Sequence, residues 1–332
     1  MMKLSLMRDV FTTVNTDWDC ELAAELAKNW KHDKAWIKMW RASANFICYL
    51  KNEEQHYVIR FNQDSERKLD HIESEIKLLH YLKSKDISIA EPVLSRNNKF
   101  IESKQTHYGK FFTCVFERVF GEQKEIGDLK KDDYITWGES LGELHKAFKG
   151  LPKVVEIHRI SHIDMFEGYA QASQSTGSAE SNEIEYLRKW LNTLNRNKEN
   201  YGLIHYDFEL DNIIWNENGV HIIDFDDSIY SWYVADIAYA LRDVFFDSTK
   251  PDKDDERFLL FIKGYRKKNA ISEEELIQMP VFYRLHNFIS YKKLQRSIDL
   301  SVSENNPTWL NELIIKLTNI KDSYYKGFLT QF

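Results

Sequence analysis

Four polar side chains stand out between residues 201 and 227, where they interrupt short apolar runs: His205, Asp207, Asn212 and Asp224. An amide oxygen and a carboxylate are hard ligands of the kind that Mg²⁺ takes, together with water and substrate phosphates. A second carboxylate can orient a hydroxyl group for attack. Positioning and charge neutralisation supply most of the catalysis of phosphoryl transfer, so this set of side chains suits that reaction.

The spacing of these residues predicts how they meet. Residues 213–215 are apolar, as are 220–223 apart from His221, and the two runs flank the turn sequence Asn-Glu-Asn-Gly at 216–219. We therefore expect a β-hairpin. Asn212 precedes its first strand and Asp224 follows its second strand, so both should lie at the open end. Asp207, five residues before Asn212, falls in a tight loop from which it could reach a hydroxyl group.

The composition bounds the class of protein. The chain has 332 residues, enough for two domains or one bilobal unit, and 43% of them are hydrophobic. The net charge of −7 argues against a general nucleic-acid binder, whose domains carry a basic face. The three cysteines are far apart and odd in number, which fits neither a disulfide framework nor paired metal ligands.

The distribution of apolar residues along the chain predicts where the protein is located. The first nine residues lack a sustained apolar core, which argues against a signal peptide. No run approaches the roughly 18 apolar residues of a membrane span. We expect a soluble, cytoplasmic protein with a small-molecule partner and no nucleic-acid or membrane partner.

The order of elements predicts the fold class. We expect a helix at 18–30, a hairpin made by 43–50 and 56–61, a helix at 67–84 and a strand at 111–119. The rest is mostly helical: 132–148 with Asp132 as its cap, 183–195, 232–247 and most of 253–332, with an exposed loop at 171–182. A strand-rich part followed by a helical part predicts an α+β fold with lobes at 1–119 and 120–332.

The helix at 67–84 contains a carboxylate in an unusual place. Glu75 falls inside the apolar stripe formed by Ile72, Ile76 and Leu79. A carboxylate on a buried face is costly unless it has a cationic or hydrogen-bonding partner. The nearest candidate is Arg60, on the preceding hairpin. The alternative is a solvated arginine and a glutamate at the rim of the stripe.

These motifs resemble a known family. The stretch from His205 to Asn212 matches the H-x-D-x-x-x-x-N catalytic loop of the protein-kinase superfamily, and Asp224 stands where its D-F-G motif lies. The closer match is the aminoglycoside phosphotransferase and choline kinase branch, which has H-G-D, D-F-D or D-W-E, and an L-G-x-L-H helix. That helix is represented by Leu141-Gly-Glu-Leu-His145, and the resemblance spans about residues 40 to 245.

The resemblance implies a bilobal kinase-like fold, ATP and Mg²⁺ as cofactors, and roles for individual residues. Asp207 resembles the base that accepts the proton of the substrate hydroxyl, and Asn212 and Asp224 resemble the Mg²⁺ ligands. His205 and His145 fit packing roles better than a catalytic one. Asp236 is expected either to tie down the catalytic loop or to cap a helix.

The nucleotide residues implied by the resemblance lie earlier in the chain. Arg60 stands where the family has a lysine or arginine that contacts ATP phosphates, and Glu75 resembles its helix partner. Two further segments complete the expected site: a phosphate-covering loop with Ser43 and Asn45, and a hinge with Glu117 and Val119 facing adenine.

The sequence departs from kinase patterns in informative ways. No G-x-G-x-x-G loop or A-P-E motif is present, which disfavours a protein kinase. Tyr206 replaces the glycine of H-G-D, and Glu209 replaces the usual histidine two residues after the catalytic aspartate. The sequence predicts an ATP-dependent kinase for a small-molecule hydroxyl. The alternative is a kinase-fold protein that binds a nucleotide or is structural, with little catalytic activity.

The sequence does not specify a single acceptor substrate. Acidic residues crowd the presumed acceptor site: Asp207, Glu209, Asp211, Asp226 and Asp227. This charge would favour an amine-bearing acceptor. Alternatively, Asp211 and Asp227 are solvated and only Asp207 and Asp224 face the site. Aminoglycoside, choline, fructosamine and homoserine types of acceptor all stay open.

Overall fold

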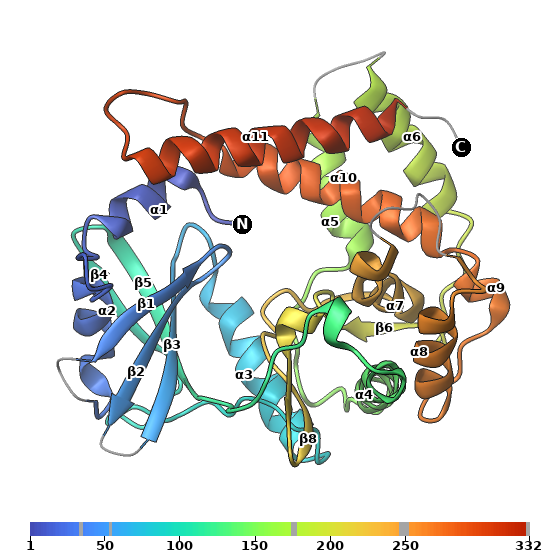
Figure 1. Cartoon of the computed structure of the whole chain (residues 1–332), viewed down its shortest axis with the longest axis horizontal. Helices are drawn as coiled ribbons and strands as arrows, with labels where there is room; N and C mark the ends of the chain where they lie inside the picture. Colours follow the sequence, from blue (N-terminus) through green and yellow to red (C-terminus); the bar gives the residue numbers. More distant parts are fainter. Residues whose placement is uncertain (33–35, 53–54, 174–177, 246–251, 330–332) are drawn as a thin grey trace. The chain divides into compact units, whose positions relative to one another are not determined.

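A computed structural model describes the chain except for residues 33–35, 53–54, 174–177, 246–251 and 330–332. The chain forms two compact units (Figure 1). Unit 1 comprises Met1–Ile76, Ala90–Arg118 and Ser290–Phe332, and unit 2 comprises Lys77–Ile89 and Val119–Ile289. The segment 290–332, which the sequence places with the helical C-terminal lobe, is thus part of the unit that contains the N-terminal strands.

Unit 1 is built on a sheet. Its strands are β1 (Ile37–Ala42), β2 (Phe46–Asn52), β3 (Gln55–Gln63), β4 (Glu102–Thr106) and β5 (Gly109–Glu117). Its helices are α1 (Leu4–Phe11), α2 (Glu21–Leu26), η1 (Ala27–Asn29), the first part of α3 (Leu69–Lys83), the last part of α10 (Met279–Ser297) and α11 (Thr308–Phe328). The described strands pair antiparallel in the order β1-β2-β3-β5-β4.

The core of unit 1 is formed by the side chains that point to one face of its strands. Phe46, Cys48 and Leu50 of β2 are all buried because side chains two apart share one face of a strand. Phe46 pairs with Phe61 of β3, and their rings stack with centroids 5.1 Å apart. The same core takes in apolar residues of α1, α2 and α11.

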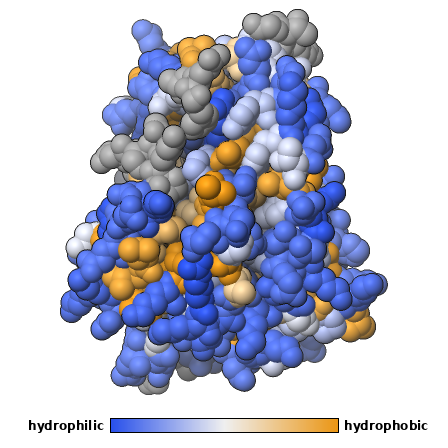
Figure 2. Space-filling view, turned by 90° about the vertical axis from the view of Figure 1, so that its right-hand side faces the viewer, coloured by the Kyte–Doolittle hydropathy of each residue, from blue (hydrophilic) through white to orange (hydrophobic). Residues whose placement is uncertain are grey.

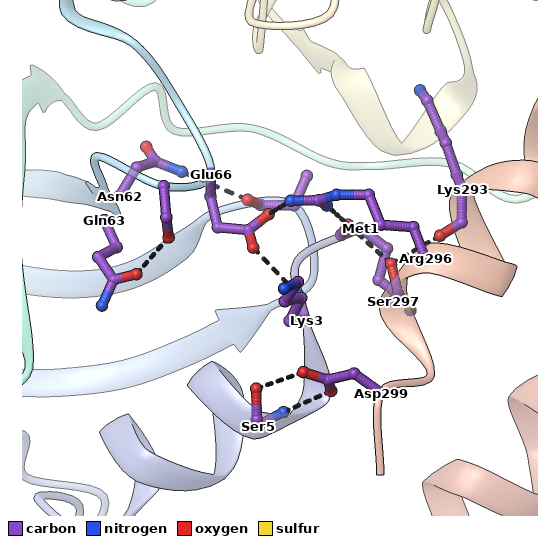
Figure 3. A network of polar contacts seen from close by, with 12 residues as sticks. Met1, Lys3, Ser5, Asn62, Gln63, Glu66, Lys293, Arg296, Ser297 and Asp299 are labelled. Carbon is purple, nitrogen blue, oxygen red and sulfur yellow. Dashed lines mark hydrogen bonds and ion pairs between the residues drawn. The ribbon is translucent and has the colours of Figure 1, made fainter. Parts of the chain in front are cut away.

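The two ends of unit 1 are joined by polar contacts (Figure 3). The carboxylate of Asp299 accepts hydrogen bonds from the Ser5 backbone N–H, at 3.0 Å, and from its hydroxyl. Arg296 is paired with Glu66 at 2.8 Å, and the Ser297 hydroxyl donates to the Met1 carbonyl at 2.9 Å. These contacts fix the N-terminus, α1 and the segment between β3 and α3 against the C-terminal end of α10 and the residues that follow it.

Unit 2 is mainly helical. Its larger helices are the rest of α3, α4 (Lys131–Lys149), α5 (His162–Gln171), α6 (Ala179–Leu191), α7 (Tyr233–Ala240), α8 (Glu256–Arg266), α9 (Glu273–Leu276) and the first part of α10. Short 3₁₀ helices are η2 (Ile126–Asp128), η3 (Leu210–Asn212) and η4 (Arg242–Phe245). Two small antiparallel pairs complete it: β6 (Tyr201–Ile204) with β9 (Ile229–Trp232), and β7 (Ile213–Asn216) with β8 (Gly219–Ile222).

Glycines allow α4 and α8 to pack backbone to backbone. A Cβ atom on Gly138 would lie 2.0 Å from the carbonyl oxygen of Phe261, and one on Gly264 would lie 1.9 Å from that of Ile135. Neither approach is possible with a larger side chain, because backbone atoms cannot yield locally. This contact sets the position of α4, including the L-G-x-L-H residues at its C-terminal half.

The structure confirms the α+β class, and most predicted elements are present. The predicted helix at 18–30 is shorter, because Trp18 has a positive φ of 65° and the helix begins only where the Cys20 side chain accepts from the Ala23 N–H. Asp132 does not cap α4. The N-cap is Lys130, whose N–H donates to the Asp133 side chain at 2.9 Å.

Two predicted segments are only partly described. The predicted helix at 232–247 ends at Ala240 and continues as η4, and residues 246–247 lie outside the described residues. The predicted loop at 171–182 is shorter, since α5 extends to Gln171 and Ser178 caps α6. Its residues 174–177 also lie outside the described part of the chain.

The face of the molecule presented in Figure 2 is mostly polar. Hydrophilic residues cover much of the face presented in Figure 2, and hydrophobic residues occupy a smaller area that crosses it. None of the described helices is both long enough and apolar enough to cross a membrane.

The close packing of α4 on α8 generates a stability prediction. Gly138→Ala should lower the free energy of unfolding by about 1–3 kcal/mol, because the added methyl group must push the two backbones apart. Urea denaturation followed by circular dichroism measures the loss. Gly168→Ala is the matched control, since nothing lies within 4 Å of its added Cβ in α5, and it should be neutral or stabilising by up to about 1 kcal/mol. Equal effects of the two changes would contradict the packing argument.

Candidate active site

The β7–β8 hairpin places two of the predicted site residues at its open end. Gly219 takes a positive φ of 110° at the turn, which other residues rarely adopt. At the opposite end, the Ile223 N–H donates to the Asn212 carbonyl at 3.0 Å. The ladder thus holds Asn212 beside the residue that precedes Asp224. Asp224 itself has a positive φ of 61°, a strained conformation for a non-glycine residue.

Asn212 and Asp207 are in direct contact. The Asn212 Nδ2 group donates to the Asp207 carbonyl at 2.8 Å and to its Oδ2 atom at 3.0 Å. An amide group has donors only on its nitrogen. These bonds therefore fix the orientation of the amide and leave its oxygen, Oδ1, on the side away from Asp207.

Asp236 anchors the loop that carries Asp207. Its carboxylate, fully buried in α7, accepts from the backbone N–H groups of His205 at 2.8 Å and Tyr206 at 2.7 Å. It also contacts His145 Nε2 at 2.9 Å. No side chain caps the start of α7. Of the two roles expected for Asp236, it therefore ties down the loop and does not cap a helix.

The two histidines have packing environments. Burial lowers the pKa of His145, although Asp236 opposes this shift, and the Nδ1 atom lies 2.8 Å from the Tyr265 hydroxyl. The His205 ring packs on Phe225 with centroids 4.6 Å apart, and its Nε2 lies 3.1 Å from the Ile223 carbonyl. Both rings therefore brace the catalytic loop.

Tyr206 departs from the glycine of the family pattern at a structural cost. Its φ is 74°, in the left-handed region that favours glycine. Its buried ring lies in edge contact with Tyr239 at 5.3 Å and with His162 at 5.6 Å, and tilted against His286 at 6.0 Å. The side chain thus joins the catalytic loop to helices α5, α7 and α10 within unit 2.

Glu209, the other departure, contacts the predicted base. The carboxyl groups of Glu209 and Asp207 share a hydrogen bond, and Glu209 is ion-paired with Arg242. Burial raises the pKa of the Glu209 carboxyl to about 10, and the neighbouring Asp207 adds to the rise. Burial would also raise the pKa of Asp207, but the bond from Glu209 and the charge of Arg242 hold it below its usual value.

The other acidic residues occupy different environments. Asp226 is buried, and Arg159 donates to its carbonyl at 2.9 Å and to that of Phe225 at 3.2 Å. Asp227 lies near enough to Asp207 to act on it through its charge, whereas Asp211 is exposed. The acidic character near Asp207 therefore comes from Glu209 and Asp227 rather than from Asp211.

Within unit 1, Arg60 and Glu75 form the ion pair that the apolar stripe predicted. Arg60 NH1 donates to Glu75 Oε1 at 2.9 Å, and NH2 contacts Oε2. Both side chains are nearly inaccessible, at 6% and 2% exposure, and the guanidinium lies over the Phe116 ring. A two-pronged pair of this kind fixes the direction of the arginine.

The loop at 43–45 is also held in unit 1. The Met2 N–H donates to the Ser43 carbonyl at 2.8 Å, and Asn62 Nδ2 donates to Asn45 Oδ1 at 2.6 Å. Asn45 is buried. Of the two predicted hinge residues, Glu117 ends β5, and Val119 follows where the chain passes from unit 1 to unit 2.

Several contact residues were missed by sequence reasoning. Arg159 and Arg242 are single cations outside any motif, and His286 and Tyr283 lie in a long helix without a polar pattern. Arg242 NH1 lies 3.0 Å from His286 Nε2. No hydrogen-bond partner for the Tyr283 hydroxyl occurs among the described residues, although the group is buried. Only the unusual Glu209 could have suggested a nearby cation.

The donor set fits magnesium. Asn212 Oδ1 and the Asp224 carboxylate are hard oxygen donors at one end of the hairpin. Mg²⁺ is commonly held by one or two protein carboxylates, with water and substrate phosphates completing six ligands. Across the described ranges, no group of three or more His, Cys, Asp or Glu residues could hold a metal by itself.

Relatives with known activities match most of the chain. It is 25% identical over 301 residues to amicoumacin kinase of Bacillus subtilis, covering 85% of this chain and 86% of the relative. The solved structure of amicoumacin kinase hAmiN, in complex with AMP-PNP, Ca²⁺ and Ami, has a TM-score of 0.74 at 22% identity. That match covers 91% of this chain and 92% of the other.

A second solved structure has the same fold. The microcompartment-associated aminopropanol kinase has a TM-score of 0.71 at 19% identity, covering 93% of this chain and 97% of the other. The kinase-like fold predicted from the catalytic loop is therefore confirmed. The model of the Phosphotransferase enzyme family matches residues 41–267, which include the hairpin, the Asp207 loop and the Arg60–Glu75 pair. The chain thus belongs to the Phosphotransferase enzyme family and is a small-molecule kinase.

Proposed function

We propose that this kinase transfers the γ-phosphate of ATP to a hydroxyl group of a small, amine-bearing molecule. The observation that carries the proposal is the contact between Asp207 and Asn212, beside the hairpin end that bears Asp224. One carboxylate is thereby available to a substrate hydroxyl, and two oxygen donors are available to a metal. A protein that only binds nucleotides would not need this arrangement.

Asp207 acts as the base in the proposed reaction. The acceptor oxygen forms a bond to the γ-phosphorus while the bond from that phosphorus to the β–γ bridging oxygen breaks. The hydroxyl proton passes to Asp207, and ADP leaves. The Asn212 amide holds the Asp207 carboxylate in place through Nδ2, so that its orientation is set before the acceptor binds.

Asn212 and Asp224 would hold Mg²⁺ through Oδ1 and a carboxylate oxygen. When bound, the metal neutralises charge on the transferred phosphate. The Asn212 side chain thus serves both groups: its nitrogen fixes the base and its oxygen is left for the metal.

Residues of the proposed N-terminal lobe, 1–119, would bind the nucleotide. Arg60, aligned by Glu75, would contact the phosphates. Ser43 and Asn45 would supply the loop that covers them, and Glu117 and Val119 the hinge backbone that faces adenine. The support is the rigid Arg60–Glu75 pair and the hydrogen bonds that hold the 43–45 loop.

Support for an amine-bearing acceptor comes from charge and from relatives. Glu209 and Asp227 surround Asp207 with negative charge. The names of two relatives, amicoumacin kinase and aminopropanol kinase, indicate small-molecule acceptors, and the second name contains an amino alcohol. These observations favour an amine-bearing acceptor.

We also propose that the enzyme works in the cytoplasm. Its three cysteines are buried free thiols. The side chains of Cys20 and Cys48 are hydrogen-bonded to each other, as expected in a reducing compartment.

A substitution of the base tests the activity. Asp207→Asn should lower kcat for phosphorylation of the best acceptor by roughly 100- to 10,000-fold, because the hydroxyl proton loses its acceptor. ADP release is measured across a panel of amino sugars, amino alcohols, sugars and homoserine. Asp132→Asn, the same change at an exposed position of α4, is the control. Wild-type turnover by Asp207→Asn would show that Asp207 is not the base. If no compound of the panel stimulates ADP release, the proposed function is wrong.

The metal assignment makes a separate prediction. Asn212→Ala and Asp224→Asn should each raise the Mg²⁺ concentration for half-maximal activity by roughly 10-fold or more, because each change removes an oxygen ligand. Magnesium titrations at fixed ATP measure this shift. Asn218→Ala, in the exposed turn between β7 and β8, is the control and should leave the titration unchanged. An unaltered magnesium requirement in both ligand variants would exclude this pair as the metal site.

A further inference from the structure

A chain of hydrogen bonds leads from the end of α4 to Asp236 within unit 2. Lys149 Nζ, at the last residue of α4, donates to Asn269 Oδ1 at 2.9 Å. Asn269 Nδ2 donates to the Tyr265 hydroxyl at 2.7 Å, and that hydroxyl lies 2.8 Å from His145 Nδ1. His145 Nε2 lies 2.9 Å from Asp236 Oδ2. The base and metal roles of the active site do not explain the outer part of this chain, from the lysine to the tyrosine.

The two ends of the chain determine the direction of every bond between them. A lysine ammonium group can only donate, and an ionised carboxylate can only accept. Because Lys149 donates to Asn269 Oδ1, the amide must present its NH2 group to Tyr265. The Tyr265 hydroxyl therefore accepts from Asn269, and its one hydrogen is left for His145 Nδ1.

His145 is consequently held in one tautomer. A neutral imidazole has a single N–H, so a ring that accepts at Nδ1 carries its hydrogen on Nε2, where it donates to Asp236. Burial lowers the pKa of His145, although Asp236 opposes the shift. The charges of Lys149 and His205 lower this pKa further and favour the neutral ring. Burial also raises the pKa of Tyr265, so its hydroxyl keeps the proton that it donates.

The tautomer of His145 bears on the loop that carries Asp207. Asp236 Oδ2 accepts from the His145 ring and from the His205 N–H. In the other tautomer the ring would turn a lone pair toward this oxygen, and two acceptors at hydrogen-bond distance repel each other. The carboxylate would then move away from the N–H groups of His205 and Tyr206, which directly precede Asp207.

We propose that Tyr265 and Asn269 are positioning residues of the kinase reaction. Oriented by Lys149, they hold His145 as the Nε2–H tautomer and thereby hold the Asp236 carboxylate that anchors the catalytic loop. A structural role alone would require only that each buried polar group has a partner, in either direction of the chain. This inference rests on the base of the proposed function and adds residues on which the position of that base depends.

The first experiment reverses the direction of the chain. Asn269→Asp replaces the NH2 donor by an acceptor of nearly the same shape, so the Tyr265 hydroxyl must turn its hydrogen to the new carboxylate. His145 must then donate from Nδ1, and it keeps its bond to Asp236 only as the doubly protonated ring. We expect kcat to be near the wild-type value at low pH and to fall roughly 10-fold or more as the pH rises and the ring loses its proton.

The control for this experiment must account for other groups that titrate near His145. Among the described residues, the titratable groups that face its ring or act on it are Asp236, Tyr265, Tyr233, Lys149 and His205. All of them are present in wild type, which is measured over the same pH range as their reference. Asn182→Asp, the same change at an exposed position of α6, should keep the wild-type pH profile. A profile of Asn269→Asp with the wild-type shape would overturn the proposal, whatever its absolute rate.

The second experiment separates positioning from folding. Tyr265→Phe removes the hydroxyl between Asn269 and His145, and kcat should fall roughly 10-fold with an unchanged KM for ATP, because the base is displaced and the nucleotide is not. Tyr81→Phe is the matched control, since it removes a hydroxyl that donates to the Ala147 carbonyl at 2.8 Å, outside the chain. Both variants should lose a similar amount of stability, measured as melting temperature. Only Tyr265→Phe should lose kcat, and equal kcat values in the two variants would contradict the proposal.

A measurement on wild type decides the direction of the chain even if a variant does not fold. Neutron diffraction from crystals grown in heavy water locates the deuterium atoms. We expect one on His145 Nε2 and one between the Tyr265 hydroxyl and His145, bonded to the tyrosine oxygen. Deuterium bonded to His145 Nδ1 would overturn the proposal. If wild type phosphorylates no acceptor, the proposed function fails, and the deuterium positions still show whether the tautomer was assigned correctly.

Discussion

The carboxylate of Asp236 is the interaction on which the active site depends. It is fully buried, and a buried charge is tolerated only when several donors satisfy it. Those donors are the N–H groups of His205 and Tyr206 and the ring of His145. Because the two N–H groups immediately precede Asp207, the position of the predicted base follows from a bond made in α7.

Helix packing determines where that carboxylate finds its partners. His145 lies in α4, whose backbone approaches α8 at Gly138 and Gly264. If those helices moved apart, His145 would shift relative to Asp236, and the carboxylate would lose one of its donors. The small residues of the L-G-x-L-H helix therefore affect the position of Asp207 only indirectly. Their effect reaches Asp207 through His145 and Asp236 rather than through direct contact.

The site residues that could be predicted from the sequence are those that interrupt a regular pattern of apolar residues or stand beside a recognisable turn. Glu75 was detectable because a carboxylate interrupted an apolar stripe, and alternation along the strand pointed to Arg60 as its partner. The hairpin that carries Asn212 was detectable from its turn. Pairs such as Glu209 with Arg242 have no such signal, because neither residue interrupts a periodic pattern and tertiary packing alone brings them together. The cap predicted at Asp132 is wrong for a related reason. The helix begins one residue earlier than expected, with Lys130 as its N-cap, and the carboxylate that bonds the cap is that of Asp133.

The Arg60–Glu75 and Arg242–Glu209 pairs differ in how far they are enclosed. In the Arg60–Glu75 pair both guanidinium nitrogens meet both carboxylate oxygens, and the two side chains are 6% and 2% exposed. That pair is complete. Glu209 instead divides its carboxyl group between Arg242 and a second acid, and Arg242 keeps 32% of its side chain exposed. The Arg242–Glu209 pair is therefore less enclosed than the Arg60–Glu75 pair, because half-exposed Arg242 still reaches solvent.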